Sequence, residues 1–301
     1  AGRRDMRQWL LAGILAGALP LIHTHSFLAL GLCSAAWFLR DLIRKKPAAP
    51  WLLYGLTTAA LALPQLVFFT FRQSGQAGFL RLHFNWVNNL NGQGLQDGYL
   101  WFYLKNIGLP LLLVIFSLFE KNPWHRRLLL GALLIWLPAE FVLFQPNPYD
   151  NNKLFYAAWA LMSIPAADCA AASYQRLRGI PARPLMAALA AVMMFLTGAL
   201  ALAREAVSDY TLFSREDAAL AEYVRRNTPR DSRFVTGFQH VNPVSSLTGR
   251  EIVVGPDLWL YYHGFDTRER QAALSAFYAD PQAHREVPAR YGAGYVLLGP
   301  Y

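Results

Sequence analysis

Residues 154–203, LFYAAWALMSIPAADCAAASYQRLRGIPARPLMAALAAVMMFLTGALALA, indicate the fold class of this chain. Two apolar stretches, at about 154–173 and 185–203, flank a short connection that carries three arginines. At about 1.5 Å of rise per helical residue, each stretch is long enough to cross a hydrocarbon core of about 30 Å. The segment therefore predicts two membrane helices joined by a basic loop.

The same pattern extends toward the N-terminus. Five more apolar stretches precede this pair, at about 8–24, 26–43, 51–71, 100–119 and 127–144. The chain is 54% hydrophobic, which is high for a soluble domain of 301 residues. We therefore expect residues 1–203 to form a membrane α-helical bundle of about seven transmembrane helices.

Basic residues alternate between the gaps that separate these stretches. Thirteen lie in the N-terminal segment and in the gaps after the second, fourth and sixth stretches: Arg3, Arg4, Arg7, Arg40, Arg44, Lys45, Lys46, Lys121, Arg126, Arg127, Arg176, Arg178 and Arg183. About four lie on the other side: Arg72, Arg81, Lys105 and Lys153. Because loops rich in Lys and Arg stay in the cytoplasm, this asymmetry predicts a cytoplasmic N-terminus. The exported face then carries residues 21–26, 72–99 and 145–153 and everything after about 204.

Charge and cysteine content exclude two other classes. The net charge of +9 would suggest a nucleic-acid partner in a soluble protein, but here it is concentrated in short loops beside apolar stretches. We therefore expect a lipid bilayer as partner and no nucleic acid. The two cysteines, Cys33 and Cys169, lie inside apolar stretches, which excludes a disulfide scaffold and matches no metal motif.

Residues 204–301 change character and contain no apolar span. Ser214 followed by Asp217 predicts a capping box that opens a helix through about Arg226. Short strands are expected at 233–236, 251–254 and 294–298, and helices at 267–278 and from Asp280-Pro281 onward. This alternation predicts a small α/β domain with a mostly parallel sheet on the exported face. It has no GxGxxG and no P-loop sequence to indicate a nucleotide site.

Two polar groups on the basic-poor side are candidate site residues. His23 and His25 could bind a divalent metal ion (Mg, Mn or Zn) together with Asp150, although interfacial histidines also simply hydrogen-bond to lipid or loop groups. In the loop 145–153, Asp150 could coordinate a cation or act as a base, Asn151 and Asn152 could bond sugar hydroxyls, and Lys153 could neutralise a phosphate. The alternative is a turn, since Pro and Asn are common turn formers.

Other polar residues are weaker candidates. Glu140 lies within the fifth stretch near its exported end, where an intramembrane carboxylate suggests function, whereas Asp168 in the sixth is interpreted as a packing residue. Arg72 and Arg81 lie in the exported loop 72–99 and could meet a lipid phosphate. That loop also contains Trp86, whose residue type is common at membrane interfaces. In the C-terminal domain, His240, Trp259 and His263 suit carbohydrate stacking or ordinary packing equally.

Three segments carry a resemblance to a known superfamily: LPLIHTHSFLALG (19–31), PYDNNKLFYAAW (148–159) and HVNPVSSLTGREIVVGPDLWLYYHGFD (240–266). They resemble bacterial membrane proteins assigned to the GT-C superfamily of integral membrane glycosyltransferases. The resemblance implies a multi-pass protein of the bacterial inner membrane, acting in the cell envelope with its C-terminal domain periplasmic or extracellular. It also implies a polyprenyl-phosphate sugar as donor and an unknown acceptor.

The chain departs from that superfamily at one position. The resemblance implies a catalytic Asp or Glu in the first exported loop, but the first exported turn here is His23-Thr24-His25-Ser26. Either this chain is a C-terminal portion of a longer protein that carries the carboxylate elsewhere, or Asp150 or Glu140 serves instead. Two other functions remain open: a transporter or flippase of a lipid-linked saccharide, and a membrane-anchored binding scaffold.

Overall fold

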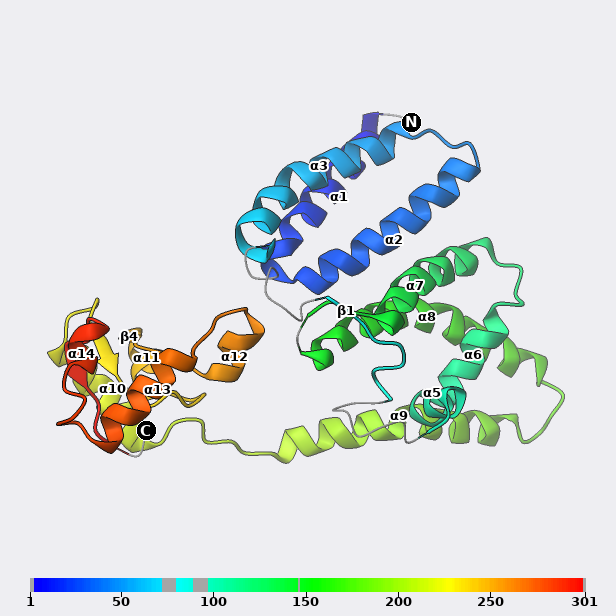
Figure 1. Ribbon diagram of the computed structural model, residues 1–301. Helices are drawn as coiled ribbons and strands as arrows, with labels where there is room; N and C mark the ends of the chain where they lie inside the picture. The colour runs from blue at the N-terminus through cyan, green and yellow to red at the C-terminus, as the bar shows by residue number, and fades with distance from the viewer. Residues whose placement is uncertain (1–2, 72–79, 89–96, 146, 300–301) are drawn as a thin grey trace. The chain divides into compact units, whose positions relative to one another are not determined.

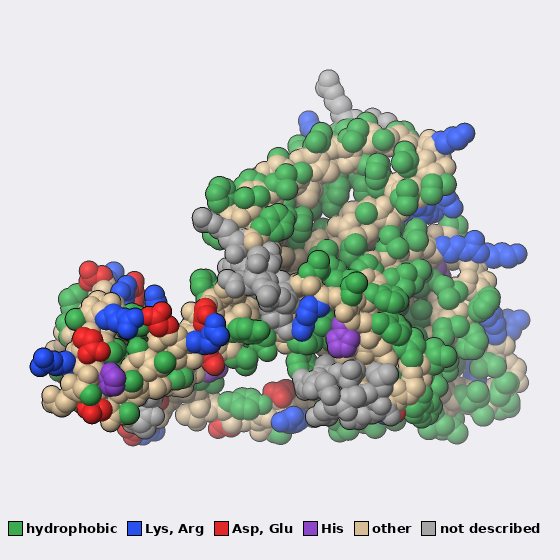
Figure 2. Space-filling view, in the orientation of Figure 1, with side chains coloured by type: hydrophobic (Ala, Val, Ile, Leu, Met, Phe, Trp, Pro, Cys, Tyr) green, Lys and Arg blue, Asp and Glu red, His purple; other side chains and the backbone are tan. Residues whose placement is uncertain are grey.

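The computed structural model describes residues 3–71, 80–88, 97–145 and 147–299. It divides into two compact units, Ala1–Ala206 and Val207–Tyr301, and each is described by itself. The first is helical, and hydrophobic side chains dominate its surface in the space-filling view (Figure 2). Charged side chains of both signs gather on the second unit in the same view. The two units therefore present different surfaces to their surroundings.

The first unit is built from helices that fall on every predicted apolar stretch. In chain order they are α1 (Arg3–Ile22), α2 (Thr24–Ile43), α3 (Ala49–Gln65) with its π-helical extension η1 (Leu66–Thr70), α5 (Tyr99–Ile107), α6 (Leu109–Ser117), α7 (Pro123–Phe141), α8 (Pro148–Arg176) and α9 (Arg183–Val207). Among the described residues, four are long and apolar enough to cross a membrane: α2, α3 with η1, α8 and α9. The pair α5 and α6 would make a fifth. These helices indicate a membrane protein, whereas the full set of seven spans remains a prediction.

The predicted span 100–119 is not one straight helix. It breaks at Gly108, and the axes of α5 and α6 meet at 105°. Gly108 has a φ of +69°, in the left-handed region that glycine adopts without strain. Pro110 follows in the first turn of α6, where its missing N–H costs nothing. The two helices are therefore either a broken span or a segment that turns back within the membrane.

The predicted span 127–144 also ends early. Helix α7 stops at Phe141, and the chain continues as the short strand β2 (Val142–Leu143). This strand pairs antiparallel with β1 (Arg81–Leu82), and the N–H of His83 donates to the carbonyl of Phe141 at 2.8 Å. Residues 142–143 form a strand because they pair with a segment some sixty residues earlier in the chain. The hydropathy of residues 127–144 contains no information about this distant partner, so it could not show where the helix ends.

The core of the first unit lies where α2, α7 and α8 pack together. Small residues allow the close approach: a Cβ added at Gly131 of α7 would lie 2.6 Å from the sulfur of Cys33 on α2. Trp86 is only 1% exposed in this core, and its indole N–H donates to the carbonyl of Ala139 at 2.8 Å. Trp86 therefore lies inside the unit, with its ring stacked on that of Phe155, although tryptophan is a residue type common at membrane interfaces.

Helices α1 and α3 form a separate close pair. Thr58 of α3 donates to the carbonyl of Gly13, and Gln65 donates to the carbonyl of Gly17 at 2.8 Å. Helix α9 differs, because none of its residues is buried although its apolar window has a mean hydropathy of 2.3. An exposed apolar surface of that length is suited to lipid rather than water.

The second unit contains a three-stranded parallel sheet in the order β4-β3-β5. Its strands are β3 (Arg233–Val235), β4 (Glu251–Ile252) and β5 (Tyr295–Val296), and its helices are α10 (Arg215–Asn227), α11 (Pro243–Thr248), α12 (Asp257–Tyr262), α13 (Arg268–Ala279) and α14 (Val287–Arg290). Neighbouring residues on β3 face opposite sides, so Phe234 and Val235 enter two different apolar clusters. Ser214 and Asp217 form the expected capping box of α10.

One expected helix of the second unit is absent from its predicted place. No helix begins at Asp280-Pro281 in this described segment; a turn follows, and α14 begins only at Val287. The Asp280 carboxylate accepts the N–H groups of Gln282 and Ala283, at 3.1 and 3.0 Å. The same side chain that would cap a helix thus stabilises a local turn instead.

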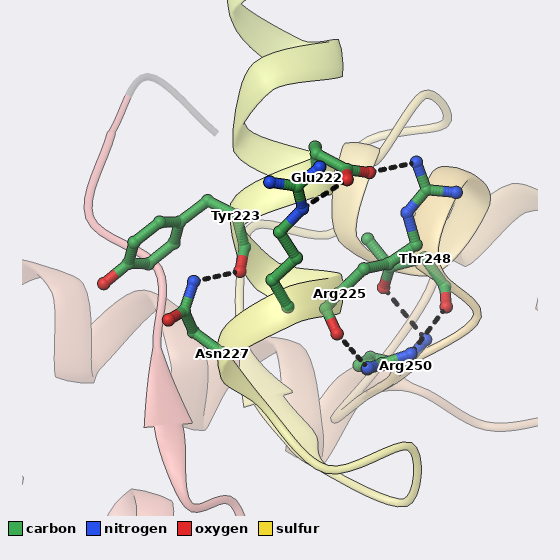
Figure 3. Close-up of polar contacts among 7 residues, drawn as sticks. Glu222, Tyr223, Arg225, Asn227, Thr248 and Arg250 are labelled. Atoms are coloured by element: carbon green, nitrogen blue, oxygen red, sulfur yellow. Dashed lines mark hydrogen bonds and ion pairs between the residues drawn. The ribbon is translucent and has the colours of Figure 1, made fainter.

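A buried arginine joins two helices of the second unit. Arg250 is 8% exposed, and its guanidinium donates to the carbonyl oxygens of Arg225, Thr228 and Thr248. Figure 3 shows Arg250 between the C-terminal ends of α10 and α11, where helical carbonyls lack partners of their own. This contact holds α11 against α10 independently of the sheet.

Candidate functional site

The candidate site lies at the ends of the helices on the basic-poor side. We call it the polar cluster and define it as His23, His25, Gln145, Asp150 and Lys153. These residues come from the α1–α2 turn, the segment after β2 and the first turns of α8. The structure thus brings together two sequence segments that lie 120 residues apart, as the His25–Gln145 contact shows.

The α1–α2 turn positions the two histidines. His23 is the N-cap of α2, and its Nδ1 accepts the N–H of Ser26 at 3.2 Å and lies 2.8 Å from the Ser26 hydroxyl. The His23 and His25 rings are 5.6 Å apart, and Gln145 Nε2 lies 3.0 Å from Nε2 of His25. In this contact the amide nitrogen of Gln145 donates and Nε2 of His25 accepts.

The start of α8 positions the charged members of the cluster. The Asn147 side chain accepts the N–H of Tyr149 and caps the helix, with Pro148 in its first turn. Asp150 therefore lies where the helix dipole favours a negative charge. Its carboxylate is paired with Lys153 at 2.6 Å, and both side chains are about one-third exposed or more. Both charges lie close enough to act on the imidazole of His25.

The two predicted sugar-binding asparagines differ in position. Asn151 is fully buried, and its amide donates to the carbonyls of Ala139 and Val142 and accepts the N–H of Phe144. All its hydrogen-bonding groups thus join α7 and β2 to α8, which gives Asn151 a structural role and leaves nothing for a ligand. Asn152 is partly exposed beside it and remains a candidate.

Glu140 lies in the last turn of α7, where it is 2% exposed. The Tyr103 hydroxyl donates to one of its carboxylate oxygens, and the other oxygen, Oε1, has no hydrogen-bond partner among the described residues. Tyr103 packs against Tyr99 and Trp136, so the carboxylate is enclosed by aromatic rings. Sequence reasoning missed the two tyrosines, although their spacing of four places them on one face of α5.

The predicted phosphate-binding arginines have unequal support. Arg81 lies on β1 opposite Leu143, two residues before Gln145 of the polar cluster, and its side chain is exposed. Arg72 lies outside the described residues. The hairpin therefore brings at least the backbone of Arg81 near the segment that carries Gln145.

An apolar groove runs between α2 and α3. Two adjoining cavities of about 260 and 320 Å³ form it, and both are lined by Ser34, Tyr54 and Gly55. Helix α3 packs along α1, whereas α2 lies apart from α3 (Figure 1). A hydrogen bond of 3.1 Å between Ser34 and Tyr54 crosses the space between α2 and α3. Phe27 and Leu66 line it at the end nearest the polar cluster, and the N–H of Phe27 bonds to the carbonyl of His23.

A second buried polar group lies at the opposite, basic-rich end of the helices. His125 is 3% exposed, with Nε2 at 2.7 Å from Asp168 and Nδ1 at 3.1 Å from Glu120. Asp168 of α8 thus has a hydrogen-bond partner on α7, although its own side chain is 62% exposed. Nothing in the sequence pattern indicated that His125 would be this partner, because it lies 43 residues away.

In the second unit, two of the three predicted binding residues are in contact. The ring of His240 stacks nearly flat on that of Trp259, with centroids 5.3 Å apart and an interplanar angle of 14°. His263 follows at the C-cap of α12 and is exposed. The stack leaves Trp259 56% exposed, which is compatible with a further ligand on this surface.

The geometry gives no support to a metal site. In the described part of the chain, no group of three or more His, Cys, Asp and Glu side chains could hold a metal ion. A divalent ion bound by His23, His25 and Asp150 therefore stays a prediction. Comparison with known proteins adds no family: no protein-family model, curated protein or solved structure matches the chain.

Proposed function

We propose that this protein is a membrane glycosyltransferase that uses a polyprenyl-phosphate-linked sugar at the exported face of the bacterial inner membrane. The observation that carries the proposal is the apolar groove between α2 and α3, which ends beside the polar cluster. A lipid with a long hydrocarbon chain and a phosphate head group needs this combination of surfaces. The groove would hold the chain, and the cluster would hold the phosphate and sugar.

The head-group end offers suitable chemistry. Lys153 can neutralise a phosphate as a compact positive charge, and Gln145 and Asn152 can bond hydroxyl groups of a sugar. In the free protein Lys153 is paired with Asp150 at 2.6 Å. A phosphate that pairs with Lys153 in place of Asp150 would leave the Asp150 carboxylate without its ion-pair partner. Binding of the donor would thereby expose the base next to the reacting sugar.

The transfer step then follows from these roles. Asp150 takes the proton of an acceptor hydroxyl as its oxygen attacks the anomeric carbon of the sugar. The bond from that carbon to the phosphate oxygen breaks, and its electron pair leaves with the polyprenyl phosphate. Lys153 stabilises the negative charge that develops on the leaving phosphate. Glu140 is the less suitable base, because it is buried beneath Tyr103.

The binding step can be tested by thermal stability of the purified protein with polyprenyl phosphate, the matching polyprenyl alcohol or inorganic phosphate. A ligand that binds only the folded form stabilises it by about 2.7 kcal/mol at a hundredfold excess over its Kd. Gly31→Leu should abolish the shift, because Gly31 lines the groove and has open space beyond it. Gly198→Leu on α9 is the matched control, since it also has open space.

Lys153→Ala should bring the shift with polyprenyl phosphate down to the shift seen with the alcohol. No shift with polyprenyl phosphate, or an equal shift in Gly31→Leu and Gly198→Leu, would refute the proposed lipid site. Transfer is tested next, by the appearance of a glycosylated acceptor in native membranes supplied with labelled donor.

A flippase of lipid-linked saccharides is the second candidate. It is favoured by the extent of the groove, which continues from Phe27 toward Phe38 and Trp51 near the basic-rich end. Movement of labelled lipid across sealed vesicles that contain the purified protein, with no glycosylated product, would select this function over transfer.

A further inference from the structure

The second unit exposes an apolar surface on one short helix. Leu258, Trp259, Tyr261 and Phe265 are each 55 to 59% exposed, and we call them the α12 surface. They lie on α12 and directly after it, at the edge of this unit in Figure 1. Water-soluble surfaces seldom gather four large apolar side chains, so a cluster of this kind indicates an interaction site.

Contacts with the interior of the second unit hold the α12 surface in place. Leu260 points inward and packs against the apolar cluster that contains Val235 and Leu274. The N–H of Phe265 donates to the carbonyl of Leu260 at 2.9 Å, which fixes the turn after the helix. His240 covers one face of Trp259 by stacking. The exposure of these rings is therefore a property of the folded unit.

The connection to α9 limits how far this unit can lie from a membrane. Six residues, 208–213, separate Val207, the end of α9, from Ser214, the N-cap of α10, so that seven Cα-to-Cα steps join the two. A fully extended segment of this length spans about 24 Å. A compact unit of 95 residues, from Val207 to Tyr301, has a radius of gyration of about 12 Å and so a diameter of about 30 Å. Because of this tether, some face of the unit stays within about 24 Å of the end of α9, and so near the bilayer that holds this helix.

We propose that the α12 surface is this face, and that it inserts into the boundary between head groups and acyl chains of the bilayer. Trp and Tyr favour this boundary because their rings are apolar while their N–H and O–H groups reach water. Leu258 and Phe265 add purely apolar area on the same surface. The insertion would hold the His240–Trp259 stack at the level of the lipid head groups.

The proposal is tested on the full chain in lipid nanodiscs with a nitroxide spin label at single introduced cysteines. Leu258→Cys and Tyr261→Cys probe the surface, and Ala219→Cys on α10, also exposed, is the control in the same unit. The unsubstituted chain, labelled in parallel, reports any reaction of the buried Cys33 and Cys169. Each variant is compared with the unsubstituted chain for its thermal midpoint, which shows that the fold is kept.

We expect the labels at 258 and 261 to be relaxed strongly by oxygen, which concentrates in lipid, and weakly by a water-soluble nickel chelate. The label at 219 should show the reverse. Equal access of the chelate to all three positions would mean that the α12 surface faces water. Loss of access to both reagents, with an immobilised spectrum, would mean that it packs against protein. Either result would overturn the proposal.

Discussion

Gly131 is the point at which the packing of the membrane helices can be tested most directly. Replacing it with alanine places a Cβ 2.6 Å from the sulfur of Cys33 and 3.2 Å from the indole nitrogen of Trp37. Both neighbours lie on α2, and Trp37 Nε1 also donates to the carbonyl of Arg127 at 2.8 Å. The added methyl group must therefore push α2 away from α7 or break this bond.

The magnitude follows from two opposing terms. Overpacking of a well-packed interior costs about 1–3 kcal/mol. Alanine is favoured over glycine in a helix by about 0.5–1 kcal/mol. Gly198→Ala gains only the second term, because open space surrounds Gly198 on α9. The free energy of unfolding of Gly131→Ala should thus fall about 1–3 kcal/mol below that of Gly198→Ala.

The assay is denaturation of the purified variants in one mild detergent, followed by near-ultraviolet circular dichroism. Cys33→Ala removes the sulfur that causes the closest contact, so Gly131→Ala should cost less in that background than in the native chain. Equal stability of Gly131→Ala and Gly198→Ala would refute the close approach of α2 and α7. An unchanged cost in the Cys33→Ala background would show that Cys33 is not the residue in contact.

Two predictions concern the second unit. The Tyr278 hydroxyl lies 3.1 Å from the carbonyl oxygen of Val235 and 2.9 Å from that of Leu297, so its single hydrogen is shared between β3 and the end of β5. Tyr278→Phe should lower the free energy of unfolding by about 1 kcal/mol in chemical denaturation. Burial raises the pKa of Tyr278 to about 12, whereas a tyrosine in an unfolded chain has a pKa of about 10. The folded state therefore favours the neutral phenol, and the native chain keeps this contribution to its stability below pH 10 and loses it between pH 10 and 12. A stability profile of Tyr278→Phe that falls as steeply as the native profile over that range would contradict this assignment. Arg250→Met should cost about 2 kcal/mol or more because three buried carbonyls lose their donor, and Arg250→Lys should not restore it, since one ammonium group cannot reach all three. Full stability of the lysine variant in the same denaturation assay would show that the charge alone matters.

Local features of the structure were largely predictable. Each apolar stretch forms helix because a run of such residues in a low-dielectric environment must satisfy its backbone hydrogen bonds internally. The capping box at Ser214 and Asp217 depends only on residues three apart, and the short parallel strands follow from runs of apolar residues between turns. These features depend on neighbours in the chain, so the sequence contains the information directly.

The candidate site was predictable only in part. The distribution of Lys and Arg predicted that His23, His25, Asp150 and Lys153 lie on the same side of the membrane. In the structure these four residues lie close together. The separate role of Asn151 was not predictable, because an asparagine in a polar turn and one that joins three elements look alike in sequence. The contact of Trp86 with Ala139 likewise joins residues 53 positions apart.

The sequence by itself determined that this is a helical protein with membrane-spanning segments and a C-terminal part of different character, since hydropathy and capping are local properties. Only the tertiary structure decided the bend at Gly108, the burial of Trp86 and Glu140, and the groove between α2 and α3. The physical reason is that these features depend on which helix faces pack closely. Because they have no side chain, Gly13 and Gly17 allow α1 to approach α3 closely, and Gly131 allows α7 to approach α2. The space between α2 and α3 remains because each of these helices packs against a different neighbour.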